Sequence, residues 1–399
     1  MLSSTSAAEI APHGSNGLDR WVLARIRRIV ATAPVTFMLW DGYEIPAAGG
    51  PPVGTILFRN RSALAAWLWD AELNFGETYV SGAVEVRGEL YSLLEAIYRA
   101  FGLPEARWWR RARANDTYAA RHNVHHHYDL GNHFYRLWLD REMVYTCAYF
   151  PTPESTLEDA QIAKMDLVCR KLRLRPRERV IEAGCGWGSL ALFMAKRYGV
   201  TVRAFNISSE QIAYARERAR AEGLDDRVEF IEDDYRNVRG ACDAFVSVGM
   251  LEHVGTPHYA TFGGVIERSL SPGGRGFLHF IGRSRAAPLN AWIRKRIFPG
   301  AYVPTLREVF ERVLEPHEFS VLDVENLRLH YAKTLEHWRR RFLNSAADVA
   351  AMFGDTFVRT WDLYLAGSQA SFTTGSLQLF QVVFARGDSN KVPWTRVSG

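Results

Sequence analysis

The chain has 399 residues, enough for about two or three domains with a substantial core. With 47% hydrophobic and 23% charged residues it has a globular composition, which excludes a disordered, collagen-like or coiled-coil architecture. The 49 basic and 44 acidic residues leave a net charge of +5, which does not by itself indicate nucleic-acid binding.

The cysteines and apolar runs indicate the compartment. Cys147, Cys169, Cys185 and Cys242 lie far apart without a Cys-x-x-Cys pair, which argues against a disulfide scaffold or a zinc ribbon. No apolar run reaches the roughly 18–20 residues of a membrane span. Residues 1–18 are rich in Ser, Ala and Gly and lack the pattern of a secretory signal. We expect a cytoplasmic protein that begins with a disordered tail over residues 1–18.

Residues 19–105 are predicted to form a small α+β domain. Leu23, Ile26 and Val30 recur at helical spacing, which predicts a first helix. The further expected elements are strands over 35–40, 54–58 and 78–86 and helices over 63–73 and 90–101.

Two basic stretches contain tryptophans. Residues 107–121 carry five arginines and one aspartate, and residues 283–296 carry five basic residues and no acid. Arginine beside tryptophan suits an anionic membrane surface. The alternative is a solvated helix face with the tryptophans packed inward. Residues 106–121 are interpreted as a basic linker.

Residues 122–399 are predicted to form the main domain, with helices and polar turns over 122–170. From Arg179 strands and helices alternate, which is typical of a parallel, doubly wound Rossmann-like α/β sheet. The expected strands cover 180–183, 201–205, 228–231, 244–248, 276–281 and 377–385, and the expected helices cover 189–198 and 209–222. Residues 284–316 interrupt this alternation as an insertion.

A glycine-rich turn follows the first strand of this domain. Gly184, Gly186 and Gly188 open a helix, where free N–H groups and the lack of side chains let a ligand approach the backbone. The G-x-G-x-G spacing, with Glu182 two positions before it, fits S-adenosylmethionine (SAM) better than the G-x-G-x-x-G of dinucleotide binders. The alternative is a tight turn that needs glycine for its conformation alone.

Polar residues after the next two strands are candidate SAM ligands. Asn206 stands where a ribose-binding acid usually ends the second strand, and Gln211 follows a little over one helical turn later. The segment Asp233-Asp234-Tyr235-Arg236 follows the third strand, where an acid and an aromatic ring could hold and cover an adenine.

Five sequence blocks extend beyond this generic pattern. They are His127-Tyr128-Asp129-Leu130-Gly131-Asn132, Tyr145-Thr146-Cys147-Ala148-Tyr149-Phe150, the glycine turn with Trp187, Gly249-Met250-Leu251-Glu252-His253-Val254-Gly255, and Leu278-His279-Phe280-Ile281-Gly282. Together they resemble the cyclopropane-fatty-acid synthases and the related mycolic-acid methyltransferases. The resemblance covers about residues 115–390 and, more loosely, Phe75-Gly76-Glu77-Thr78-Tyr79. It implies a class I SAM-methyltransferase fold with a smaller N-terminal lipid-binding domain.

The resemblance also implies roles for individual residues. Tyr145, Thr146, Gly184, Gln211 and the segment Asp234-Tyr235-Arg236 are expected to contact SAM. Cys147, Glu252, His279, Tyr331 and the backbone of Ile281 are expected to hold a bicarbonate ion beside the reacting carbons. The chain departs from the family in having Asn206 where Thr is usual and Thr146 where Ser is usual. Family members are often dimers, so a homodimer is an expected state.

The first functional hypothesis is cyclopropanation of an unsaturated acyl chain of a membrane phospholipid, at the inner face of the membrane. Attack of the double bond on the sulfonium methyl group leaves a carbocation, and loss of a proton closes the ring. Glu252 is expected to orient the bicarbonate or to accept its proton. The alternatives are C-methylation without ring closure, and a lipid-binding protein with a decayed active site. Three consecutive histidines, 125–127, rarely converge on one ion, so no metal is expected.

Overall fold

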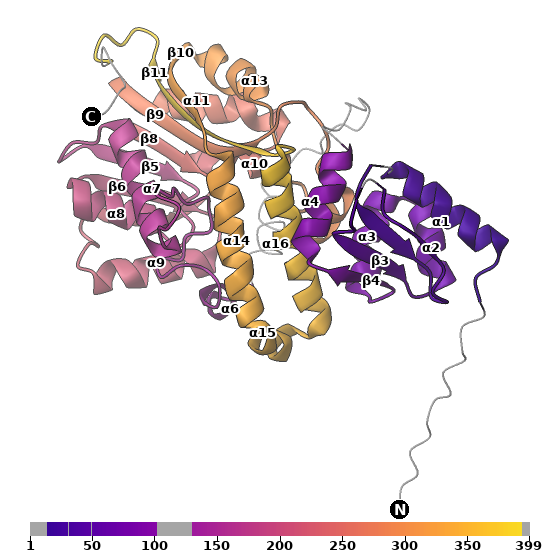
Figure 1. The fold of residues 1–399 in the computed structure, drawn as a ribbon. Helices are drawn as coiled ribbons and strands as arrows, with labels where there is room; N and C mark the ends of the chain where they lie inside the picture. Colours follow the sequence, from indigo (N-terminus) through magenta and orange to yellow (C-terminus); the bar gives the residue numbers. More distant parts are fainter. Residues whose placement is uncertain (1–13, 31, 49, 102–129, 393–399) are drawn as a thin grey trace, which may run out of the picture.

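The computed structural model describes residues 14–30, 32–48, 50–101 and 130–392, and the fold is built from these residues. A small α/β unit lies beside a larger unit that contains a seven-stranded sheet (Figure 1). Outside the described residues lie residues 1–13 of the expected tail, the expected linker over 106–121 and the histidines at 125–127. The expected tail over 1–18 is wrong at its end, because Gly17 and Leu18 belong to the first helix.

The small unit has a four-stranded sheet in the order β2-β1-β3-β4. Its elements are α1 (Gly17–Ile29), β1 (Val35–Met38), β2 (Glu44–Ile45), β3 (Gly54–Phe58), α2 (Arg61–Trp69), α3 (Ala71–Val80), β4 (Val84–Gly88) and α4 (Leu90–Phe101). The expectation of a strand over 78–86 is wrong in its first half, because Thr78, Tyr79 and Val80 belong to α3. The expected helix over 63–73 is also broken at Asp70, which caps α3 by accepting the Leu73 N–H at 3.0 Å.

The large sheet has the order β10-β11-β9-β8-β5-β6-β7. Its strands are β5 (Arg179–Ala183), β6 (Thr201–Asn206), β7 (Val228–Glu232), β8 (Cys242–Val248), β9 (Leu270–Gly282), β10 (Phe319–Asn326) and β11 (Gln378–Arg386). The strands from β9 to β7 are parallel, whereas β11 is antiparallel to both β9 and β10. The predicted doubly wound α/β architecture is therefore confirmed, with an antiparallel edge whose outer strand β10 the sequence analysis did not identify.

Helices cover both faces of this sheet. On one face lie α7 (Leu157–Leu172), α8 (Ser189–Tyr198) and α9 (Ser209–Ala221), whose apolar side chains share a core with the strands. On the other lie α10 (Leu251–Val254) and α11 (Tyr259–Ser269). The remaining helices before the hairpin are α6 (Asn132–Arg136), η1 (Tyr235–Asn237), η2 (Thr256–His258), α12 (Ala291–Arg296), α13 (Leu306–Val309), η3 (Phe310–Leu314) and η4 (Glu315–His317).

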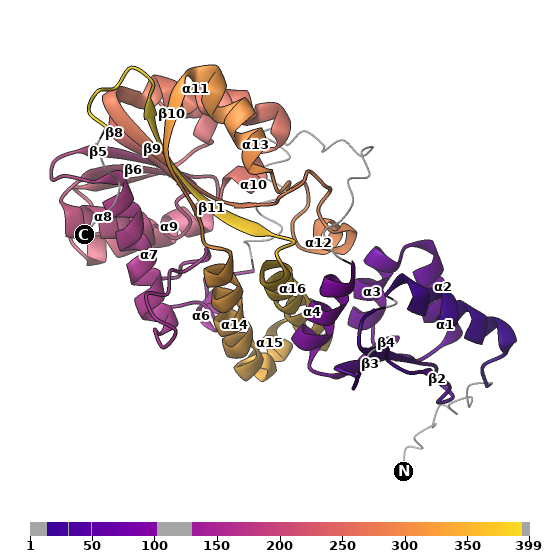
Figure 2. The same ribbon diagram turned by 45° about the horizontal axis from the view of Figure 1, so that its top comes forward.

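A helical hairpin that the sequence analysis did not predict joins the two units. It consists of α14 (Arg328–Asn344), α15 (Ala346–Phe353) and α16 (Asp355–Thr374). Both views show α16 between α14 and α4, and α16 packs on α3 and α4 of the small unit (Figures 1 and 2). In the described part of the chain, no helix combines the length and apolar character needed to cross a bilayer.

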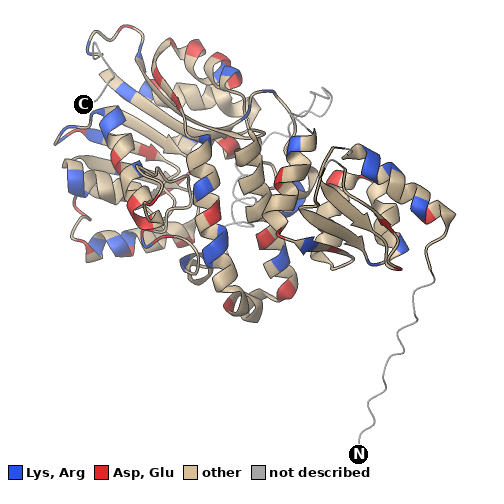
Figure 3. Ribbon diagram, viewed as in Figure 1, with Lys and Arg blue, Asp and Glu red and all other residues tan. Residues whose placement is uncertain are grey.

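The second basic stretch lies largely against the small unit. Trp292 is buried and packs on Gly76, where an added Cβ would lie 2.3 Å from the indole. Arg283 is buried and donates to the carbonyl oxygens of Ala287 and Pro288, each at 3.0 Å. Arg296 forms two hydrogen bonds to Glu77 at 2.8 and 2.6 Å. Trp292 therefore packs inward, as the alternative expects, whereas membrane contact of residues 283–296 stays a prediction. Figure 3 shows basic residues spread over both units.

Candidate functional site

Two cavities meet near the carboxyl ends of the parallel strands. The smaller has a volume of about 170 Å³ and is lined by the glycine turn and by the segments after β6, β7 and β8. The larger, of about 800 Å³, is mainly apolar and lies between the small unit, the helical hairpin and the large sheet. Tyr145, Thr146, Gly249 and His253 line both cavities, so these residues mark the junction.

The glycine turn forms one wall of the smaller cavity. Gly184 and Gly186 line it and have positive φ angles of 84° and 53°. A Cβ on Gly184 would also lie 2.9 Å from the Met250 Cβ. Gly188 does not line the cavity, since a Cβ there would lie 2.5 Å from the Phe230 ring. The structure thus brings two of the three predicted glycines to the cavity and gives the third a packing role.

The other predicted SAM ligands also line the smaller cavity. The Asn206 Nδ2 donates to Gln211 Oε1 at 2.7 Å, and the Asn206 Oδ1 accepts the Ile207 N–H at 2.8 Å. Asp234 is buried, and its carboxylate accepts the Arg236 N–H and Nη1 at 2.9 Å each. Tyr235 packs edge-on against Phe262. The segment carrying Asp234 is therefore ordered by its own contacts.

A buried charged group that the sequence analysis did not propose lies beside the junction. Lys164 on α7 donates from Nζ to Thr146 Oγ1 at 2.9 Å and lines the smaller cavity. Burial lowers the pKa of Lys164 to about 8, against the attraction of Asp140, Cys147 and Glu182. Burial raises the pKa of Glu182 to about 8, and its Oε2 has no hydrogen-bond partner among the described residues. Lys164 and Glu182 therefore place a buried amine and a buried acid in the wall of the smaller cavity.

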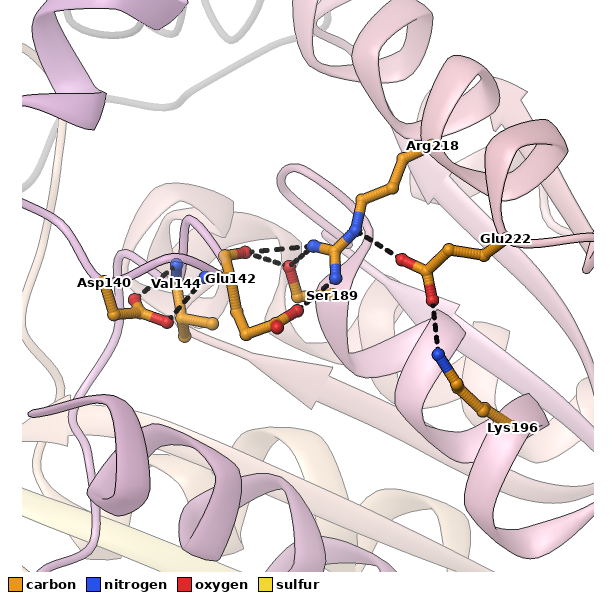
Figure 4. Close-up of polar contacts among 7 residues, drawn as sticks. All are labelled: Asp140, Glu142, Val144, Ser189, Lys196, Arg218 and Glu222. Atoms are coloured by element: carbon orange, nitrogen blue, oxygen red, sulfur yellow. Dashed lines mark hydrogen bonds and ion pairs between the residues drawn. The ribbon is translucent and has the colours of Figure 1, made fainter.

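Hydrogen bonds anchor the segment that delivers Tyr145, Thr146 and Cys147 (Figure 4). Asp140 accepts the N–H groups of Glu142 and Val144 at 2.9 and 3.0 Å. Arg218 on α9 binds the Glu142 carboxylate and reaches the Ser189 hydroxyl at 3.1 Å. Its Nε also binds Glu222 at 2.8 Å. The segment is therefore anchored to α8 and α9.

All five residues predicted to hold bicarbonate line the larger cavity, although they come from separate elements. Glu252 on α10 is buried and accepts the Ile281 N–H at 2.6 Å through Oε1, while its Oε2 has no partner among the described residues. Burial raises the pKa of Glu252 to about 7. Because the Ile281 N–H binds Glu252, it is not free to donate to an ion in this arrangement.

His279 on β9 is held from the neighbouring strand. The Gln381 amide is oriented so that its Nε2 donates to His279 Nδ1 at 3.2 Å, which leaves the His279 Nε2 as the ring donor. That atom is buried without a partner among the described residues. Burial lowers the pKa of His279 well below its usual range, so the ring is neutral.

Cys147 and Tyr331 complete the predicted set. The buried Cys147 thiol donates to the Ala148 carbonyl oxygen at 3.1 Å, and burial raises its pKa, so it is a hydrogen-bond donor and not a nucleophile. Tyr331 on α14 packs against Phe372 at 4.5 Å between ring centroids. Unpartnered buried atoms on Glu252 and His279 fit a small polar guest such as bicarbonate. Among the described residues no group of three or more His, Cys, Asp or Glu could hold a metal ion.

Further residues join the site through long-range contacts. Tyr364 on α16 lies in the larger cavity with its hydroxyl 2.8 Å from the Tyr145 hydroxyl. Gln381 on β11 lies directly opposite His279 on the neighbouring strand β9. The sequence signal for Gln381 is a polar residue inside the mainly apolar strand 377–385. The signal for Lys164 is a charged residue on an otherwise mainly apolar face of α7.

Comparison with known proteins agrees with this geometry. The family described as mycolic acid cyclopropane synthetase matches residues 115–382, and a domain of unknown function matches residues 23–102. The chain is 35% identical to a probable fatty acid methyltransferase of Pseudomonas putida, over 91% of this chain and 95% of that protein. It is 42% identical to the cyclopropane-fatty-acyl-phospholipid synthase of Escherichia coli K12, over 66% and 68%. A structure of a mycolic acid cyclopropane synthase with SAH and CTAB aligns with a TM-score of 0.63 and 29% identity, covering 66% of this chain and 97% of that one.

Proposed function

The chain belongs to the mycolic acid cyclopropane synthetase family of SAM-dependent methyltransferases, and from this premise we propose that it converts a double bond in a phospholipid acyl chain into a cyclopropane ring. The observation that carries the proposal is the junction of the two cavities. A smaller cavity, whose lining includes the amide and acid side chains of Asn206, Gln211 and Asp234, meets an apolar cavity of about 800 Å³ at Tyr145 and Thr146. An apolar cavity of this size suits an acyl chain.

The residues of the smaller cavity would bind SAM and orient its methyl group. When bound, SAM supplies an electrophilic methyl group. Gly184 and Gly186 leave room at the backbone, Asn206 and Gln211 offer amide groups, and Lys164 fixes the Thr146 hydroxyl at the junction. An alkene is a weak nucleophile, so alignment is the main contribution and can be worth about 7–11 kcal/mol.

The residues of the larger cavity would shield the carbocation from water and help to remove its proton. Transfer of the methyl group to one alkene carbon leaves a carbocation on the other, and loss of a proton from the new methyl group closes the ring. The aromatic faces of Tyr145, Tyr364 and Phe298 line the cavity and would stabilise a desolvated cation by up to about 2 kcal/mol each. The apolar wall also excludes water, which would trap the cation.

Cys147, Glu252, His279 and Tyr331 would hold bicarbonate, which supplies a base when bound. The neutral His279 ring presents a donor, and the Cys147 thiol is protonated. Glu252 would accept a hydrogen bond or a proton through Oε2, because the Ile281 N–H occupies only Oε1.

The wider assignment is also part of this proposal. The N-terminal domain (19–105) binds lipid, and residues 122–399, with an insertion over 284–316, carry the catalytic domain. The protein is cytoplasmic, binds the inner face of the membrane peripherally and forms a homodimer. The lipid role of the N-terminal domain and the homodimer rest on the family resemblance, and the location rests on the cysteine pattern and the basic stretches. The larger cavity supports the lipid role because Ile26, Phe37 and Ile97 of the small unit line it.

The test is an incubation of the purified protein with SAM and liposomes of mono-unsaturated phospholipid. The fatty esters are analysed by mass spectrometry before and after mild hydrogenation. A gain of one CH2 that then takes up no hydrogen is the expected result, because a cyclopropane lacks the double bond. No gain on any unsaturated acyl chain, with SAM still bound, would overturn the proposal.

The second candidate is C-methylation of the same double bond without ring closure. It is favoured by the similarity, over most of both chains, to the Pseudomonas putida protein named as a probable fatty acid methyltransferase. The same gain of one CH2 followed by hydrogen uptake would select it. A lipid-binding protein without transferase activity would instead fail to bind SAM in calorimetry.

A further inference from the structure

We propose that the outer face of α1, together with the end of α2, docks this protein on an anionic lipid bilayer. This inference rests on the proposed function, because the face lies at the end of the larger cavity and would present bilayer lipid to it. The face lies outside both basic stretches, residues 107–121 and 283–296.

The face is apolar and exposed. Leu18, Trp21 and Ile29 of α1 have 66%, 57% and 51% of their surface exposed. Their spacing of three and eight residues places them on one side of the helix. At the end of α2, Trp69 is 91% exposed and the neighbouring Leu68 is 46% exposed. Exposed tryptophans are costly in water and suit the interface of a bilayer.

The same face carries uncompensated positive charge. Arg25 and Arg28 are exposed and share the α1 stripe with Trp21, and Arg25 lies over the Trp21 ring at 5.8 Å. Neither arginine has an acidic partner in the described part of the chain. The acid on α1, Asp19, is buried and bound by Arg61 through two hydrogen bonds of 2.8 Å. Asp70, next to Trp69, is engaged as the cap of α3.

The face is continuous with the larger cavity. Ile29 belongs both to the exposed stripe and to the cavity lining, so the cavity reaches the surface beside the end of α1. Trp67 and Ala71, on either side of Leu68 and Trp69, also line the cavity. A bilayer that received Trp69 and Ile29 would therefore place its acyl chains at the opening of the cavity.

These observations favour a lipid surface over a protein partner. The arginines suit the anionic headgroups, and the tryptophans and branched apolar residues suit the acyl-chain boundary beneath them. The competing basic residues in the last turn of α12 lie against the small unit, because Arg296 binds Glu77 and the nearby Trp292 is buried. Figures 1 and 3 show α1 at the outer side of the small unit, away from the large sheet, with basic residues along it.

The experiment measures binding of the full chain to vesicles by flotation. The vesicles contain either phosphatidylglycerol with phosphatidylcholine or phosphatidylcholine alone. Arg25→Glu with Arg28→Glu should weaken binding to the anionic vesicles by at least about 25-fold, since loss of each basic residue alone is worth about fivefold. Trp69→Ser should weaken binding to both kinds of vesicle by about tenfold. Arg197→Glu with Arg220→Glu, two exposed arginines on α8 and α9, is the matched charge control, and Val324→Ser on β10 is the apolar control.

Two further readouts separate the possible failures. The α1 and α2 variants should methylate mono-unsaturated phospholipid dispersed in detergent as the wild type does, because they leave both cavities intact. An inactive wild type in detergent would overturn the proposed function, while the vesicle result still decides the docking surface. Unchanged vesicle binding by the variants, or no binding by the wild type, would overturn this inference. A variant that turns a dimer into a monomer in light scattering would assign the face to a second copy of the chain.

Discussion

At the residue scale, Glu252 combines a backbone hydrogen bond with a carboxylate oxygen that has no partner among the described residues. Glu252→Gln keeps the shape and the Ile281 contact but removes the ability to accept a proton. We expect turnover to fall by at least about 100-fold. SAM affinity should not change, because Glu252 does not line the smaller cavity. Calorimetry measures the SAM affinity and product analysis measures the turnover. A variant with wild-type turnover would remove Glu252 from the mechanism.

The same residue makes stability depend on pH. Its pKa is raised by burial from 4.5 to about 7, so the folded state keeps a proton that the unfolded chain loses. The stabilisation is therefore complete below about pH 4.5 and is lost as the pH rises through about 7. Glu252→Gln lacks this loss. Thermal unfolding at about pH 5 and about pH 8 should show a smaller decrease for the variant than for the wild type, and equal decreases would contradict the assignment.

Lys164 was not proposed from the sequence, and its replacement should weaken SAM binding. Lys164→Met leaves Glu182 and Asp140 buried without their nearby positive charge and frees the Thr146 hydroxyl. We expect a loss of about 2–4 kcal/mol of stability and about tenfold weaker SAM binding. Denaturant unfolding and calorimetry measure both. Lys196→Met, which removes an exposed lysine from α8, should change neither, and unaltered SAM binding by Lys164→Met would argue against its role.

At the scale of elements, Arg218 couples α9 to the segment that carries the junction residues (Figure 4). Arg218→Met leaves Glu142 and Glu222 without their shared cation. We expect a loss of about 1–3 kcal/mol of stability, with a further decrease in turnover because Tyr145 and Thr146 are less firmly placed. Denaturant unfolding and steady-state kinetics measure the two effects. Arg220→Met on the same helix is the control, and an equal effect of both variants would show that the loss comes from the helix surface.

Elements with a strong local pattern were predictable. The glycine turn and α8 follow from local sequence alone, and the expected bounds 189–198 are those observed. The helix α3 was not, because Thr78, Tyr79 and Val80 have strand propensity. Capping by Asp70 and packing of Tyr79 under Arg359 override that preference. The hairpin α14–α16 was missed, and its aromatic face is defined only by tertiary contacts, in which Trp338 and Trp361 meet Trp138.

The site shows the same division. Residues inside contiguous motifs, such as Tyr145 and Glu252, were predictable from the family resemblance, and the structure brings them to the two cavities. Gln381 lies 102 residues from His279 and meets it only through the antiparallel pairing of β11 with β9. Such a contact depends on tertiary structure, so one sequence without an alignment gives no direct signal for it.

At the scale of the whole molecule, the larger cavity exists only because the small unit packs against α12 and α16. Glu77 on α3 and Arg296 on α12 form a charged contact across this boundary, with two hydrogen bonds. The sequence analysis gave membrane contact as one interpretation of residues 283–296, whereas the structure gives Arg296 a partner on α3. The two assignments make opposite predictions for a charge exchange.

Arg296→Glu alone should place two acids together and loosen the boundary, which lowers turnover of lipid by several-fold but leaves SAM binding unchanged. Adding Glu77→Arg restores an opposite-charge pair and should recover most of that turnover. Vesicle flotation should be the same for the double variant and the wild type, because the net charge is equal and the α1 face is untouched. If the double variant still binds anionic vesicles more weakly, Arg296 contacts the bilayer and the boundary role is wrong. Recovery of turnover with unchanged flotation would mean that the two units must stay packed for the larger cavity to hold an acyl chain.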